Sequence, residues 1–150
     1  MVRALPLWLA AAWLMSLSTI GFLVVPLLFV YLPTPAVAGA MAAHLFTAQT
    51  ALSVACGTGL LLAARSPRCE ITTELARRVS AWTLGGLLLA MLVEWGVGPH
   101  IVARENLAFW HRLGTGMYVG QWLAALAVFA SLTGAATANA SARAEPENGA

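Results

Sequence analysis

The residue in this sequence with the clearest capacity for chemistry is a glutamate inside a long apolar run. Glu94 lies within the run from about Ser80 to Val102 and is the one charged side chain well inside such a run. A carboxylate in lipid costs about 2.5–3.5 kcal/mol on insertion scales, so it is expected to face a helix bundle's interior with a partner, or to be protonated. Glu94 is therefore a candidate functional group, and the alternative is a neutral acid that only bonds helices together.

Other unusual residues lie at a similar depth in the other apolar runs. His44, Glu94 and Gln121 are each eight residues, or roughly 12 Å along a helix, from the same end of their runs. Tyr118 lies one turn above Gln121, and Pro26 is roughly 9 Å from that end of the first run. We hypothesise that Glu94, His44, Tyr118 and Gln121 form one buried polar network. A Glu–His pair there could relay protons or hold a cation, because histidine titrates near neutrality; the alternative is a purely structural network.

A second polar group is expected where the third run ends and the fourth begins. Pro99 removes one helix hydrogen bond and is expected to kink or end the helix there. The outer rim beyond it comprises His100, Arg104, Glu105, His111 and Arg112. Whether a metal is bound is left open, and His111, His44 or His100 would be its ligands.

The familiar enzyme signatures are absent from the sequence. It contains no HExxH, CxxC or phosphate-loop pattern, and no nucleophile stands at a diagnostic spacing from a base. We therefore expect no enzymatic activity, no catalytic residue and no bound cofactor, with haem or copper as the alternative. The formal charge of +2 is too small to suggest nucleic-acid binding.

The elements that must position these residues are membrane helices. The chain is 60% hydrophobic and 9% charged, whereas a soluble domain carries about 25% charged residues. Four apolar runs, about residues 7–32, 36–64, 80–102 and 113–136, are long enough to cross a ~30 Å hydrocarbon core. Because backbone groups in lipid must bond within their own segment, these runs must be helices. We predict an all-α, integral membrane bundle of four transmembrane helices over residues 1–136, with a disordered cytoplasmic tail at 137–150.

The positions of the arginines predict the orientation. Six of the eight fall before the first run, between the second and third, or after the fourth, namely Arg3, Arg65, Arg68, Arg77, Arg78 and Arg143. Because cytoplasmic segments are enriched in arginine and lysine, both termini are expected in the cytoplasm, with the chain in a bacterial inner membrane. In the segment between the second and third runs, Thr72 or Thr73 is expected to cap an extension of the third helix that carries Glu74 and Arg78 at i, i+4.

Small residues indicate where helices touch. Gly116 and Gly120 form a GxxxG pair in the fourth run, and such pairs let helix backbones approach closely in membranes. The contact is expected either within the chain or between chains. The expected partners are the lipid bilayer and either a second copy or other membrane proteins.

Three stretches of the sequence resemble a known family. They are residues 21–29, with a glycine, an apolar run, a proline and a phenylalanine; Ala38-Gly39 followed by Leu45-Phe46; and Pro99-His100-Ile101 joined to residues 109–113. In their order and spacing they are similar to the domain-of-unknown-function 4149 family, also called transmembrane-protein-205-like. The resemblance implies a four-helix membrane protein with no established activity. The family's distant likeness to copper-resistance and haem-related membrane families favours His111, Pro26 and Pro99 as meaningful positions.

These observations are compatible with three hypotheses for the function of the protein. The first is a non-enzymatic membrane protein, accessory to transport or to a larger membrane assembly. The second is a haem- or copper-binding bundle. The third is a proton- or cation-coupled carrier centred on Glu94, which requires a water-filled path to that residue.

Overall fold

A computed structural model describes residues 4–69 and 71–144, and this part of the chain is helical without a strand. Its elements are α1 (Leu5–Thr19), η2 (Ile20–Val24), α2 (Val25–Tyr31), α3 (Pro35–Arg65), η3 (Pro67–Cys69), α4 (Thr73–Met91), η4 (Leu92–Val97), α5 (Gly98–Val102) and α6 (Leu107–Ala144). Four continuous helices are long and apolar enough to cross a membrane: Leu5–Tyr31, Pro35–Arg65, Thr73–Val102 and a segment of α6, Leu107–Ala138. The predicted all-α architecture of four membrane-length helices is confirmed.

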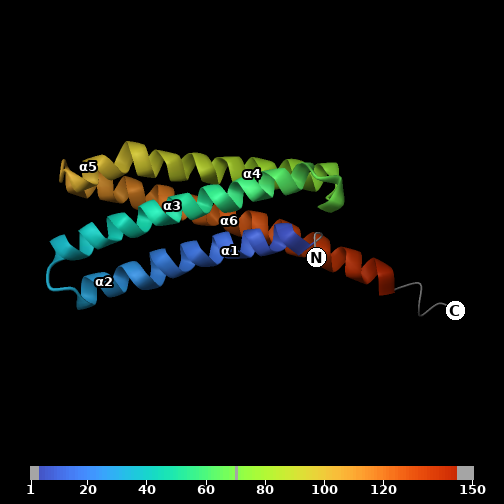
Figure 1. Ribbon diagram of the computed structural model, residues 1–150, viewed down its shortest axis with the longest axis horizontal. Helices are drawn as coiled ribbons and strands as arrows, with labels where there is room; N and C mark the ends of the chain where they lie inside the picture. Colours follow the sequence, from blue (N-terminus) through green and yellow to red (C-terminus); the bar gives the residue numbers. More distant parts are fainter. Residues whose placement is uncertain (1–3, 70, 145–150) are drawn as a thin grey trace.

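The four helices lie side by side along the long axis of the molecule (Figure 1). α1 packs against α3 and α6, and α4 packs against the same two helices from the other side. The start of α1 and the connection from α3 to α4 lie at one end, while the connections from α2 to α3 and from α5 to α6 lie at the other (Figure 1). The arginine-rich connection and the outer rim are therefore at opposite ends.

The tightly packed core lies in the half of the bundle near the arginine-rich end. Its largest fully buried side chains include Trp13, Leu17, Leu60, Val79 and Val128. By contrast, η2, α2 and α5 contribute no buried residue. Towards the other end, α2 packs chiefly on α3, and α5 packs on η4 and α6. The bundle is therefore closed at the arginine-rich end and looser towards the rim.

Each proline inside a membrane helix follows a π-helical segment. The segment η2 precedes Pro26, and η4 precedes Pro99. A proline ring in a helix clashes with the carbonyl four residues earlier, and those carbonyls belong to Phe22 and Trp95, inside the two π segments. The wider π turn changes the position of these carbonyls, which accounts for the helix continuing past Pro99 to Val102 rather than ending there.

Two helices are longer than their apolar runs. α4 begins at Thr73 rather than near Ser80, and α6 spans Leu107–Ala144 rather than about 113–136. The first eight residues of the expected disordered tail are thus helical, because residues 135–144 are rich in alanine, the strongest helix former. The rest of that tail lies outside the described residues.

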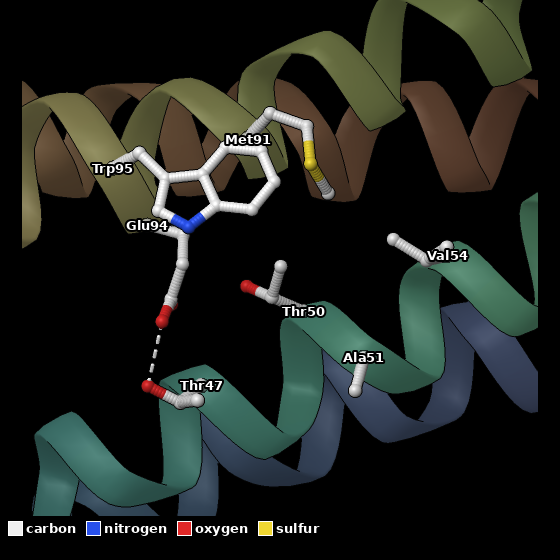
Figure 2. A pocket seen from close by; sticks show the side chains of 7 residues that line it. All are labelled: Thr47, Thr50, Ala51, Val54, Met91, Glu94 and Trp95. Carbon is white, nitrogen blue, oxygen red and sulfur yellow. Dashed lines mark hydrogen bonds between the residues drawn. The ribbon is translucent and has the colours of Figure 1, made fainter.

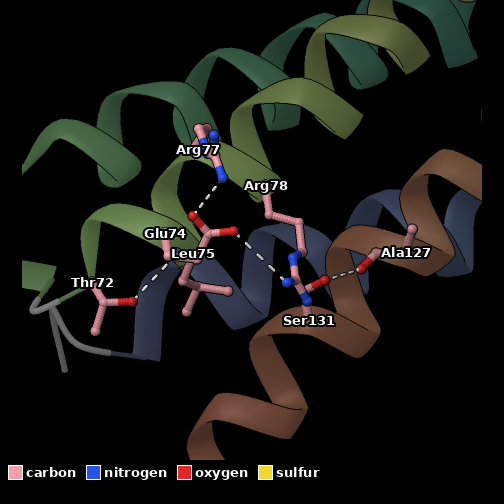
Figure 3. Close-up of polar contacts among 7 residues, drawn as sticks. All are labelled: Thr72, Glu74, Leu75, Arg77, Arg78, Ala127 and Ser131. Carbon is pink, nitrogen blue, oxygen red and sulfur yellow. Dashed lines mark hydrogen bonds and ion pairs between the residues drawn. The ribbon is translucent and has the colours of Figure 1, made fainter.

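Of the two threonines expected to cap the third helix, Thr72 does so (Figure 3). Its Oγ1 accepts a hydrogen bond from the Leu75 backbone N–H at 3.3 Å. Glu74 pairs with Arg77 at 2.7 Å and with Arg78 at 3.9 Å. These pairs are exposed and contribute little, so the cap is the main local determinant of where α4 starts.

Replacing Thr72 by alanine is expected to lower the free energy of unfolding by about 1 kcal/mol, because an N-cap threonine satisfies an otherwise unbonded backbone N–H. Hydrogen exchange should show faster exchange at the Leu75 amide. Thr73→Ala is the matched control, since Thr73 is exposed and does not cap the helix. Equal exchange rates in the two variants would contradict the assignment of the cap.

Candidate functional site

The structure does not join the four polar residues expected at one depth into a single network. The Tyr118 hydroxyl donates to the Leu17 carbonyl at 2.8 Å, and a Cβ on Gly21 would overlap the Tyr118 ring. Gln121 is buried and bonds to α3 instead, while His44 is exposed. Equal depth did not bring these side chains together, because they point from their helices in different directions.

Ser53 is the centre of a buried polar network that links three helices. Its Oγ accepts from Gln49 Nε2 at 3.3 Å and from Gln121 Nε2 at 3.0 Å, and it donates to the Gln49 carbonyl at 2.8 Å. Gln49 Nε2 also donates to Ser16 Oγ on α1 at 3.1 Å. Ser53 is fully buried, and Gln49 and Gln121 are nearly so. Of these residues, Gln121 alone was expected from the sequence to join a buried network. The i, i+4 spacing of Gln49 and Ser53 was the available signal for those two.

Glu94 lies apart from this network, on the wall of a cleft between α3 and η4 (Figure 2). The cleft has a volume of about 490 Å³ and is lined by Thr47, Thr50, Ala51, Val54, Met91, Glu94 and Trp95. The half-buried Glu94 points across it, and its Oε1 accepts a hydrogen bond from Thr47 Oγ1 at 2.8 Å. In Figure 2, α1 and α6 lie behind the two helices that form the walls. The cleft is therefore on the side of the bundle and is largely apolar apart from one carboxylate and two threonines.

Glu94 owes its position to a π-helical turn. It lies in η4, and such turns occur frequently at functional sites. The neighbouring Trp95 is 72% exposed at the mouth of the cleft. In a membrane-spanning helix, a carboxylate with one hydrogen-bond donor beside it is an energetic cost. Glu94, its donor Thr47 and the cleft that they line are the candidate functional site.

The outer rim is organised around His100. His100 Nδ1 lies 2.7 Å from Glu105 Oε2, and its ring stacks on Trp110 with centroids 4.1 Å apart. These contacts close the loop between α5 and α6, in which Arg104 and Asn106 take left-handed backbone conformations, with φ of 57° and 36°. These contacts of His100 therefore hold the hairpin of α5 and α6 closed.

The other side chains expected at the outer rim do not come together in one site. Arg104, His111 and Arg112 are exposed, and the Thr115 hydroxyl donates to the His111 carbonyl rather than to its ring. Within residues 4–69 and 71–144, no three His, Cys, Asp or Glu side chains are grouped so that they could hold a metal ion.

The two glycines of the GxxxG pair differ in their surroundings. A Cβ on Gly120 would lie 3.1 Å from Leu89 Cδ1 on α4, whereas one on Gly116 would meet nothing within 4 Å. Gly120 therefore marks a contact within the chain. Gly116 is exposed.

Four membrane-length helices around a buried polar network, with a cleft on one side, define a helical membrane protein. The family model for Domain of unknown function (DUF4149) matches residues 8–109. The match covers more than half of the chain, so the protein belongs to this family, as the three sequence stretches indicated. Neither the comparison with curated proteins nor that with solved structures finds a match.

Proposed function

We propose that this chain is a non-enzymatic, multi-pass membrane protein that serves as a component of a larger membrane assembly, or as an accessory to transport, by receiving a further transmembrane helix in its cleft. The observation that carries the proposal is the placement of Glu94. Its carboxylate is on the side of the bundle, in a cleft walled by α3 and η4, with Thr47 as its hydrogen-bond donor.

The chemistry of the cleft suits a helix better than it suits lipid tails. An ionised carboxylate can accept about four hydrogen bonds, and acyl chains supply none. Side chains that donate across a helix interface satisfy such a group, and small residues such as Ala51 let backbones approach closely. A partner helix would therefore lower the cost of placing Glu94 in the membrane.

The proposal includes an orientation. Arg65, Arg68, Arg77 and Arg78 lie at the end of the bundle opposite Arg104 and Arg112. The excess of arginine supports placing that end in the cytoplasm, with both termini on the same side and the rim outside, in a bacterial inner membrane. Glu94, eight residues before the outer end of its helix, is then in the half of the membrane nearer the outer surface.

Site-specific photocrosslinking in intact membranes tests this role. A photoreactive amino acid at Val54, in the cleft, is expected to yield protein adducts, while the same group at Met15, exposed on α1, should yield lipid adducts. If Val54 and Met15 both gave lipid adducts alone, the cleft would be a lipid-filled surface and the proposal would fail.

A carrier centred on Glu94 is the second candidate, and the position of Glu94 in a π-helical turn favours it. It predicts that Glu94→Gln abolishes proton or cation flux through vesicles containing the protein. The alternative of haem or copper binding through His111, His44 or His100 is tested by an absorption spectrum and metal analysis of the purified protein.

A further inference from the structure

One face of α3 combines small side chains with the exposed histidine. The small residues of this face are exposed in the protomer: Ala40, Thr47, Ala48, Ala51, Ala55 and Thr58. Thr47, Ala51 and Ala55 repeat at i, i+4, i+8, the small-xxx-small pattern of close helix packing in membranes. His44 lies within this face, three residues before Thr47. We call these residues the small-residue face.

The small-residue face adjoins the cleft, so a histidine and a carboxylate lie on the same side of the molecule. Thr47 and Ala51 belong to both. The hydrogen bond from Thr47 to Glu94 places these two residues at one level, and His44 is about 4.5 Å further along α3. In the described part of the chain, no ion pair or hydrogen bond engages His44, and no ion pair engages Glu94.

We propose that a second copy of this chain packs on the small-residue face, and that His44 of each copy pairs with Glu94 of the other. This inference rests on the proposed function and names the occupant of the cleft. Two copies inserted in the same direction are related by a two-fold axis along the membrane normal, which keeps every residue at its own depth. Because an isologous interface brings residue i against j and j against i, a patch that holds both a histidine and a carboxylate at similar depth complements itself.

Packing supports the same arrangement. Leu84, Leu88 and Trp95 are strongly exposed on α4 and η4, and Trp95 lines the cleft, whereas α3 presents small side chains. A second copy placed across the axis can set large side chains against small ones, as ridges and grooves of helices do. The pairing also gives each Glu94 a second partner inside the membrane.

The dimer is tested in vesicles of phosphatidylethanolamine and phosphatidylglycerol, with the full chain labelled at its C-terminus and diluted stepwise into lipid. Single-molecule photobleaching gives the fraction of dimers. His44→Glu and Glu94→His should each weaken dimerisation about tenfold or more, because each removes both symmetric pairs. The double variant, which exchanges the two residues, should restore it.

His111→Ala is the matched control, since His111 is an exposed histidine on α6 away from this face, and it should dimerise as the unaltered chain does. Ala55→Trp adds a test without a charge change, because a large side chain on an exposed position obstructs the interface and leaves the protomer folded by circular dichroism. Dimerisation that is unchanged in His44→Glu, Glu94→His and Ala55→Trp would overturn the inference. A monomer at all dilutions, together with Val54 adducts to a different protein, would overturn it too while leaving the proposed function standing.

Discussion

Gly86→Leu is expected to destabilise the bundle by about 1–3 kcal/mol or more, because it overpacks a core that has no free space at this position. A Cβ on Gly86 would lie 2.7 Å from Trp13 Cη2, 3.0 Å from Trp13 Cζ2 and 3.2 Å from Ala124 Cβ. Trp13 is fully buried and Ala124 nearly so. Neither can withdraw without moving α1 or α6, so α4 would have to separate from both.

The adjacent glycine supplies the control for this prediction. A Cβ on Gly85 would meet nothing within 4 Å, and replacing a helical glycine there should gain up to about 1 kcal/mol of helix propensity. Unfolding in mild detergent by increasing sodium dodecyl sulfate should therefore separate Gly86→Leu from Gly85→Leu by several kcal/mol. Equal stabilities would mean that α4 does not approach α1 and α6 through Gly86.

The membrane-length helices could be predicted from the sequence because lipid imposes one simple requirement on length and composition. The ends could not be predicted as well. Residues 73–79 of α4 mix charged and apolar side chains, and the Thr72 cap marks where this part of the helix begins. The end of α6 depends on alanine propensity rather than on hydropathy. Hydropathy identifies the part of a helix that is in lipid, not the part that continues beyond it.

The candidate site could be predicted only in part. Glu94 stood out because a charge in an apolar run is rare, and the structure places it on a cleft. Its partner was mispredicted, since depth along a helix does not fix direction around it. The π-helical turn of η4 holds more residues than an α-helical turn, which changes the direction of the following side chains around the helix axis. A face assigned on α4 therefore does not continue into α5.

Ser53 could not be singled out because most hydroxyls in these helices bond to their own backbone. Ser131 donates to the Ala127 carbonyl, and Thr133 to the carbonyls of Phe129 and Ala130. Ser53 does the same, but its oxygen also accepts from the amide of Gln49 one turn earlier on α3 and from the amide of Gln121 on α6. That difference comes from tertiary packing, which the pattern along the chain does not contain.

Ser53→Ala is accordingly expected to lower the free energy of unfolding by about 1–3 kcal/mol, the cost of leaving a buried donor without an acceptor. The substitution removes the oxygen to which Gln49 Nε2 and Gln121 Nε2 both donate. Gln49 Nε2 keeps its hydrogen bond to Ser16 Oγ, whereas Gln121 Nε2 loses the acceptor that joins it to α3. The loss should exceed the ~0.6 kcal/mol of an average hydrogen bond between membrane helices.

A second substitution separates this network from simple loss of a hydroxyl. Gln121→Leu has nearly the same volume and removes the amide that Ser53→Ala leaves without this acceptor. Adding it to Ser53→Ala should therefore cost less than the two single losses combined, with a coupling of about 0.5–3 kcal/mol. Ser131→Ala, which removes a bond within α6 alone, should stay within about 0.5 kcal/mol of the unaltered chain. Strict additivity of Ser53→Ala and Gln121→Leu would show that Ser53 does not join α3 to α6, and the bundle would then be held together by apolar packing around Trp13 without a polar link.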